Sequence, residues 1–129
     1  MSAKNKSEQL MRVLVVDDHP SAREAVSDVL RQAGYDVATC ASATEALARL
    51  AHQPVDVIVT DLQMPGMNGL EVKDRLATIG NTIPVIFITA HDEVGVREKA
   101  LTAGALAFLR KPFDDELLVK TVRQALKEK

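Results

Sequence analysis

Runs of apolar residues rich in Val and Ile constrain the fold of this 129-residue chain most strongly. Three of them, VLVV (13–16), VDVIVT (55–60) and VIFIT (85–89), are nearly continuous rather than alternating. Strands that are buried on both faces of a parallel sheet have this pattern. ALAFL (105–109) is a fourth run, and the weaker run YDVATC (35–40) is one more strand candidate, which we expect nearer an edge. In chain order the five expected strands therefore cover residues 13–16, 35–40, 55–60, 85–89 and 105–109.

Apolar residues recur at helical spacing between these runs. The apolar stripes of the expected helices run over residues 22–33, 43–50 and 72–79, and residues 93–103 form a weaker helix. The last stripe runs over residues 118–126, with Asp114 or Asp115 at the start of its helix. Ser42 and Glu45 form a capping-box pattern at the start of the second helix. A strand followed by a helix is thus repeated five times, and right-handed crossovers place helices on both faces of a parallel sheet. This order predicts an α/β, doubly wound fold, and it leaves both common strand orders open.

Composition narrows the classes of function. The chain is 47% hydrophobic and 26% charged, which is typical of one soluble globular domain. A net charge of -2 and the lack of a Lys/Arg block argue against direct nucleic-acid binding. The single cysteine, Cys40, cannot form an intramolecular disulfide, and we expect a small buried side chain in a reducing cytoplasm. The run 13–16 is too short for a membrane span, and residues 1–11 are expected to form a flexible arm before a domain of residues 12–129.

Polar side chains follow four of the expected strands. Asp17 and Asp18 follow the first, Asp61 the third, Thr89 ends the fourth, and Lys111 follows the fifth. Parallel strands present their carboxyl ends at one edge of the sheet, where such folds bind ligands. Three carboxylates in one pocket repel one another, so they raise a pKa or recruit a cation, and Mg²⁺ prefers oxygen ligands of this kind. An ammonium and a hydroxyl group complete the electrostatic clamp that phosphoryl transfer requires.

Asp61 is the candidate nucleophile because it stands alone, whereas Asp17 and Asp18 are suited to metal binding. Each group also has a simpler interpretation. The Asp pair is common in turns and helix caps, Thr89 is an ordinary strand residue, and Lys111 is an ordinary solvated lysine. The carboxylates, the threonine and the lysine all fall at successive strand ends along one edge of the sheet, which favours a single site.

Four segments resemble the signature segments of response-regulator receiver domains of two-component signalling: VLVVDD, VIVTDLQMPGMNGLE, VIFITA and AGALAFLRKPF. The resemblance extends from Arg12 to about Lys127, and ITAHDEV is similar to the nitrogen-fixation-regulator branch. It implies a flavodoxin-like (βα)5 fold with a five-stranded parallel sheet in the order 2-1-3-4-5. It also implies a phosphoacceptor, not an enzyme, whose donor is a sensor histidine kinase or a phosphotransfer protein. A receiver-like interaction module that acts without phosphorylation is the alternative.

The resemblance also implies a role for each site residue. Asp61 becomes the phosphoacceptor. Asp18 binds Mg²⁺, or Mn²⁺, directly, and Asp17 does so mainly through water. Asp61 and the backbone carbonyl of Gln63 complete the protein ligands of the metal.

Thr89 and Lys111 are implied to bind the phosphoryl oxygens, and the Lys111–Pro112 bond is implied to be cis. Thr89 then moves toward the phosphoryl group, and Phe108 rotates inward as a switch. An ordinary core aromatic is the simpler interpretation of Phe108. Gln63 and His91 flank the site and are expected to tune the lifetime of the acyl phosphate, although His91 is also typical of an exposed loop histidine.

The expected output surface is formed by residues 93–103, 105–109 and 115–126, through which we expect partner binding or a homodimer. Two other classes of protein fit less well. A phosphatase-like hydrolase requires Asp-x-Asp, and Gln63 occupies the second position. A nucleotide-binding module requires a glycine-rich loop after the first strand, which this chain lacks.

Overall fold

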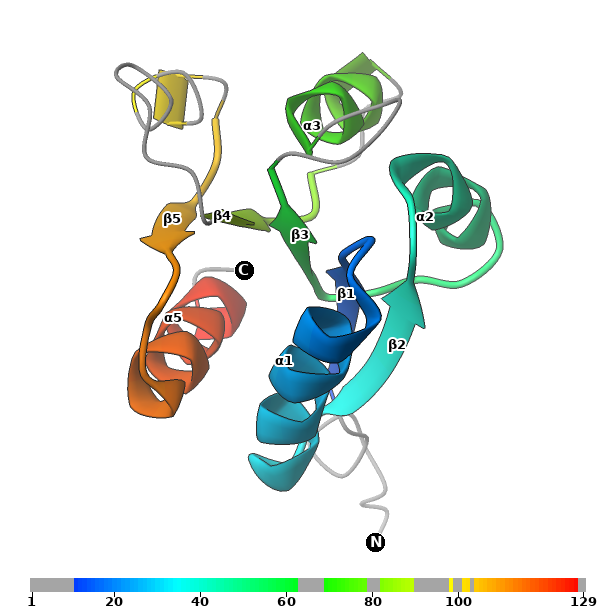
Figure 1. Cartoon of the computed structure of the whole chain (residues 1–129). Helices are drawn as coiled ribbons and strands as arrows, with labels where there is room; N and C mark the ends of the chain where they lie inside the picture. Colours follow the sequence, from blue (N-terminus) through cyan, green and yellow to red (C-terminus); the bar gives the residue numbers. More distant parts are fainter. Residues whose placement is uncertain are drawn as a thin grey trace, which may run out of the picture.

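The computed structural model describes residues 11–62, 69–78, 82–89, 98, 101–102 and 104–127. Strands and helices alternate from β1 to β4, and β5 and α5 follow (Figure 1). The strands are β1 Arg12–Val16, β2 Asp36–Cys40, β3 Val57–Asp61, β4 Val85–Thr89 and β5 Ala107–Arg110. The helices are α1 Pro20–Gln32, α2 Ala43–Leu50, α3 Gly69–Thr78 and α5 Asp115–Lys127.

The five strands form one parallel sheet in the order β2-β1-β3-β4-β5. This order confirms the flavodoxin-like topology and the edge position of β2. In Figure 1, α1 and α5 cover one face of the sheet, and α2 and α3 cover the other. β3 lies at the centre, so the residue at its end has a strand end on each side.

Alternate residues of the strands face two separate cores. Leu14, Ile58 and Phe87 pack with residues of α2 and α3. Val15 and Ile88 pack with residues of α1 and α5. Because both faces are covered, β3 and β4 are buried at every position, as their continuous apolar runs predict.

Local signals set the helix ends. Ser42 accepts a hydrogen bond from the Glu45 backbone N–H at 3.1 Å, while the Glu45 carboxylate accepts one from the Ala41 N–H at 3.0 Å. The predicted capping box is therefore confirmed with a shift of one residue in its return bond. Gly34 has φ 102°, and its N–H and that of Tyr35 donate to carbonyls of the last turn of α1, which ends that helix.

Several elements differ by a few residues from the apolar pattern that indicated them. α1 begins at Pro20, two residues before its apolar stripe, because proline is well suited to the first turn of a helix. β5 begins at Ala107 instead of residue 105, after a turn at Gly104 with φ 98°. α3 begins at Gly69, three residues before its apolar stripe. Within the predicted helix 93–103, the described residues 98, 101 and 102 are helical.

Cys40 ends β2 and is buried, as predicted. Burial raises the pKa of its thiol, and the Glu45 carboxylate raises it further, against the opposing effect of Arg49. The thiol is therefore neutral near pH 7, as expected of a packing residue. None of the helices in the described ranges is both long and apolar enough to cross a membrane.

Candidate functional site

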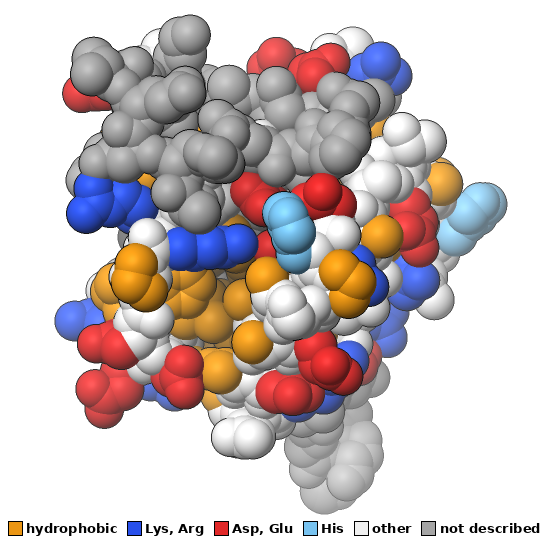
Figure 2. All heavy atoms as spheres, viewed as in Figure 1, with side chains coloured by type: hydrophobic (Ala, Val, Ile, Leu, Met, Phe, Trp, Pro, Cys, Tyr) orange, Lys and Arg blue, Asp and Glu red, His pale blue; other side chains and the backbone are white. Residues whose placement is uncertain are grey.

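The acidic residues predicted to share a site do converge at the carboxyl edge of the sheet. Asp17 directly follows β1, Asp61 is the last residue of β3, and Lys111 directly follows β5. The Lys111 Nζ atom lies 3.2 Å from Asp17 Oδ2 and 3.9 Å from Asp61 Oδ2. Figure 2 shows acidic, basic and histidine side chains gathered on this part of the surface.

Asp17 is fixed on all sides. Its side chain is fully buried, and its backbone N–H donates to the Cys40 carbonyl at 3.2 Å. Oδ1 accepts a hydrogen bond from the His19 backbone N–H at 2.9 Å, and Oδ2 accepts one from Lys111. The Arg23 guanidinium donates to the Asp17 carbonyl at 2.8 Å. Both carboxylate oxygens are therefore held in place by contacts within the chain.

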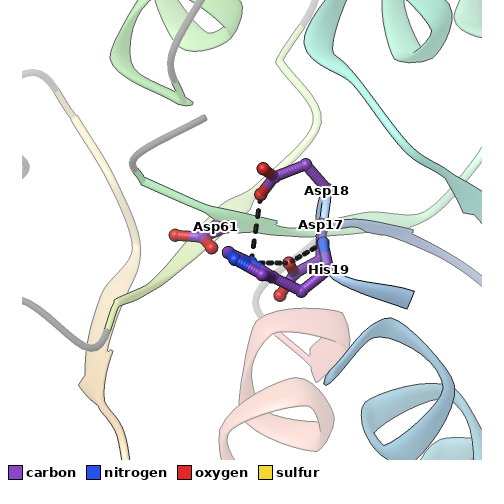
Figure 3. A group of neighbouring side chains, drawn as sticks. All are labelled: Asp17, Asp18, His19 and Asp61. Atoms are coloured by element: carbon purple, nitrogen blue, oxygen red, sulfur yellow. Dashed lines mark hydrogen bonds and ion pairs between the residues drawn. The ribbon is translucent and has the colours of Figure 1, made fainter. Parts of the chain in front are cut away.

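Four residues offer ligand atoms for a metal ion: Asp17, Asp18, His19 and Asp61, whose donor atoms lie within 4.8 Å of one another (Figure 3). Asp18 Oδ1 is buried and has no hydrogen-bond partner among the described residues. An ion with bonds of about 2.1 Å holds its ligands at most about 4.2 Å apart, so small side-chain rotations would close this group around it. The unsatisfied oxygen and the three carboxylates fit a divalent cation.

Thr89 ends β4 next to Asp61, because the register pairs Asp61 with Ile88. It is fully buried, and its carbonyl accepts the Lys111 backbone N–H at 2.8 Å. Phe108 pairs in register with Phe87, and both belong to the core on the α2 and α3 side. Residues two apart on a strand share a face, so Thr89 and Phe108 occupy the same side of the sheet.

An apolar groove of about 320 Å³ begins beside Lys111. Residues of α1 and of the start of α5 form its walls, and Figure 2 shows the hydrophobic surface between them. The apolar residues that line it are Ala22, Ala25, Val26, Val29, Pro112, Phe113 and Leu118.

The site therefore joins Asp17, Asp18, Asp61 and Lys111, as predicted, and the Lys111–Pro112 bond is cis. Two predicted site positions, at 63 and 91, lie outside the described residues. The sequence interpretation gave no role to His19, whose ring reaches the acidic group. Its position directly after the two aspartates was the available signal.

Comparison with known proteins agrees with this geometry. The family model of the response regulator receiver domain matches residues 13–123. The response regulator protein TmoT of Ectopseudomonas mendocina is 35% identical over 127 residues, which are 98% of this chain and 58% of that protein. The match includes nearly all of this chain but only somewhat more than half the length of these curated relatives.

Solved structures resemble this chain over nearly their whole length. A response regulator receiver protein from Burkholderia phymatum is 49% identical with a TM-score of 0.81, and the match covers 91% of this chain and 95% of that one. A FixJ-N structure is 34% identical with a TM-score of 0.87, covering 94% and 97%. The second match agrees with the nitrogen-fixation-like branch but is too general to assign it. Sequence, topology and acidic pocket agree, and this chain belongs to the response-regulator receiver family of two-component signalling, whose members are phosphoacceptors and not classical enzymes.

Proposed function

We propose that residues 12–129 form the receiver domain and that Asp61 is its phosphoacceptor. One observation carries this assignment: Asp17, Asp18 and Asp61 meet Lys111 at a single edge of the sheet. Asp61 occupies the end of the central strand, between the aspartates that follow β1 and the threonine that ends β4. Both carboxylate oxygens of Asp17 accept hydrogen bonds within the chain, from the His19 N–H and from Lys111.

In the proposed reaction, a carboxylate oxygen of Asp61 attacks the phosphorus of a phosphohistidine. The new O–P bond forms as the P–N bond breaks, and the electron pair of that bond remains on the imidazole nitrogen. Lys111 lies 3.9 Å from Asp61, near enough for its ammonium group to stabilise the negative charge that develops on the phosphoryl oxygens. Thr89, at the end of the adjacent strand, supplies a hydroxyl for the same oxygens.

Asp17 and Asp18 are the residues we propose to hold Mg²⁺ or Mn²⁺, with Asp61. When bound, the cation supplies positive charge that offsets the carboxylates and the transferred phosphoryl group. Asp18 carries the buried oxygen without a hydrogen-bond partner among the described residues, which supports a direct contact. Asp17 is already bonded to Lys111 and the His19 backbone, which supports a contact through water.

Thr89 and Phe108 form the switch we propose. A phosphoryl group on Asp61 would attract the Thr89 hydroxyl, and this movement would free volume on the face that Phe108 shares. Phe108 is half-buried, so it has space to change its packing. Because phenylalanine has no hydroxyl group, the switch depends on packing alone.

The donor we propose is a sensor histidine kinase or a phosphotransfer protein. A protein that brings a phosphohistidine to Asp61 must cover the surface beside Lys111. The apolar groove between α1 and α5 begins at that lysine and offers surface to be buried in such a complex. The acidic pocket supplies the chemistry, and the groove is the docking surface we assign to the donor.

Intact-protein mass after incubation with acetyl phosphate tests the proposed function. The wild type is expected to gain the mass of one phosphoryl group with Mg²⁺ and to gain none with EDTA. Asp61→Asn is expected to gain none in either condition. Asp28→Asn is the matched control, because that aspartate is exposed on α1 and pairs with Arg31, and it is expected to behave as the wild type.

Two results would contradict the assignment. A gain in Asp61→Asn equal to that of the wild type would place the phosphoryl group on another residue. No gain in any condition would favour the module that acts without phosphorylation, and binding partners would then be the subject of the search.

For output we propose the surface formed by β5, α5 and the helical residues before them. It carries three exposed leucines, Leu101, Leu106 and Leu117, which are 42%, 38% and 43% exposed. We expect beryllofluoride, which mimics the phosphoryl group, to raise the sedimentation coefficient by favouring a homodimer. Leu117→Glu should abolish this increase, and an unchanged coefficient in the wild type would exclude self-association as the output.

A further inference from the structure

His19 brings a nitrogen ligand to the acidic pocket. Its Nδ1 atom lies 3.4 Å from Asp17 Oδ1 and 3.3 Å from Asp18 Oδ1, and Figure 3 shows the ring beside both carboxylates. His19 is the residue before α1, yet its side chain makes no capping hydrogen bond. The ring therefore contributes nothing to the helix start and faces the pocket instead.

The backbone holds His19 beside the pocket. The His19 N–H donates to Asp17 Oδ1 at 2.9 Å, which closes a tight turn between β1 and α1. Asp17 is fully buried and bonded to Lys111, so the turn is anchored at both sides.

The contact between His19 and Asp18 leaves a polar atom unsatisfied. Asp18 Oδ1 lies 3.3 Å from the His19 nitrogen but has no hydrogen bond to any described residue. A shared cation satisfies the carboxylate oxygen and the imidazole lone pair together. Two ligands with bonds of about 2.1 Å to a tetrahedral zinc ion lie about 3.4 Å apart. The distance of 3.3 Å between His19 Nδ1 and Asp18 Oδ1, the carboxylate proposed to contact the cation directly, matches that spacing.

Ligand chemistry then decides the class of ion. Mg²⁺ prefers oxygen ligands and keeps several waters, so an imidazole adds little to its binding. Imidazole suits Zn²⁺, Ni²⁺ and related ions, whose affinity for mixed nitrogen and oxygen sites rises from Mn²⁺ toward Cu²⁺. We propose that His19 is a metal ligand that gives this pocket a second specificity, for transition-metal ions that compete with Mg²⁺. The proposal depends on the proposed function in one respect, that the acidic pocket is a divalent-cation site.

Direct binding measurements on the whole chain test the proposal. We would titrate Mg²⁺, Mn²⁺, Co²⁺ and Zn²⁺ into the wild type, His19→Ala and His52→Ala, and follow heat release and the visible absorption of Co²⁺. His19→Ala keeps the backbone N–H that bonds Asp17 and removes no cap, so it should fold as the wild type. His52→Ala is the matched control, because that histidine is exposed beyond the end of α2.

His19→Ala is expected to weaken Co²⁺ and Zn²⁺ binding by at least about tenfold, since even changes outside the ligand shell cause losses of that size. The loss should shrink toward Mn²⁺ and stay below about threefold for Mg²⁺, following the order of nitrogen affinity. The Co²⁺ absorption of the wild type should indicate a nitrogen ligand that the variant lacks. Excess Mg²⁺ should raise the apparent dissociation constant of Co²⁺, as a shared pocket requires.

Each contrary result has a distinct meaning. Equal Zn²⁺ affinity in the wild type and His19→Ala, with Mg²⁺ binding intact, overturns the proposal and leaves the proposed function standing. An equal loss for Mg²⁺ and Zn²⁺ also overturns it, because the effect is then not specific to nitrogen. A pocket that binds neither ion rejects the divalent-cation site and the His19 proposal together. Loss of Zn²⁺ binding in His52→Ala would place the ion at an adventitious surface site.

Discussion

Replacing Lys111 by methionine is expected to slow phosphorylation by acetyl phosphate by about 100-fold or more and to destabilise the metal-free protein by about 3 kcal/mol. The rate falls because the variant lacks the ammonium group that lies 3.9 Å from Asp61 in the wild type. This ammonium group would stabilise negative charge on the transferred phosphoryl group. The stability falls because Asp17 is fully buried and loses the cation 3.2 Å away. Methionine keeps the length and most of the volume of the side chain, so packing changes little.

A double-mutant cycle separates the ion pair from other effects. Asp17→Asn removes the carboxylate, and the double variant Asp17→Asn/Lys111→Met removes both charges. The free energies of unfolding in EDTA should give a coupling energy between about 0.5 and 3 kcal/mol, because the two groups are in contact. Lys120→Met is the matched control on the exposed face of α5, and it should change stability by less than about 0.5 kcal/mol.

Two results would contradict the roles of Lys111. If Lys111→Met unfolds like Lys120→Met in EDTA, the lysine does not compensate buried charge. If it is phosphorylated at the wild-type rate, the lysine does not stabilise the transferred group. Adding Mg²⁺ is expected to restore the stability of Lys111→Met if the pocket binds the ion, because the cation offsets the charge of the same carboxylates.

The sequence predicted the sheet well because both of its faces are covered. A strand buried on both sides must be apolar throughout, and β3 and β4 are buried at every position. Periodicity identified the strands and helices, but it left the strand order open, and the order came from the family resemblance. The shifted boundaries at Pro20 and Ala107 depend on turn geometry, which a hydrophobic pattern does not record.

The site was predictable for a different reason. Parallel strands bring their carboxyl ends together, so Asp17, Asp61 and Lys111 were expected at one edge before any distance was known. The place of His19 was not predictable in this way. The loop after β1 folds back so that the His19 N–H donates to the Asp17 carboxylate, and the ring lies beside Asp17 and Asp18. Composition and periodicity do not reveal a local hydrogen bond of this kind.

Phe87→Ala is expected to lower the free energy of unfolding by about 3–5 kcal/mol, the usual loss for a large aromatic residue in a core. Phe87 is fully buried in β4 and packs in the core on the α2 and α3 side. Because domains are stable by only about 5–15 kcal/mol, the melting temperature should fall by about 10 °C or more. Leu117→Ala, at an exposed position of α5, is the control and should change little.

This variant also separates stability from chemistry. Phe87 lies two residues before Thr89 and does not belong to the acidic group. Phe87→Ala should therefore still gain a phosphoryl group at temperatures well below its melting temperature. Lys111→Met should show the opposite pattern in Mg²⁺, with a folded protein that is phosphorylated slowly. If Phe87→Ala were as stable as Leu117→Ala, the register that buries Phe87 against the core would be wrong. If Phe87→Ala were folded but could not be phosphorylated, the arrangement of the site residues at the strand ends would require the intact core as well as the backbone pairing of the strands.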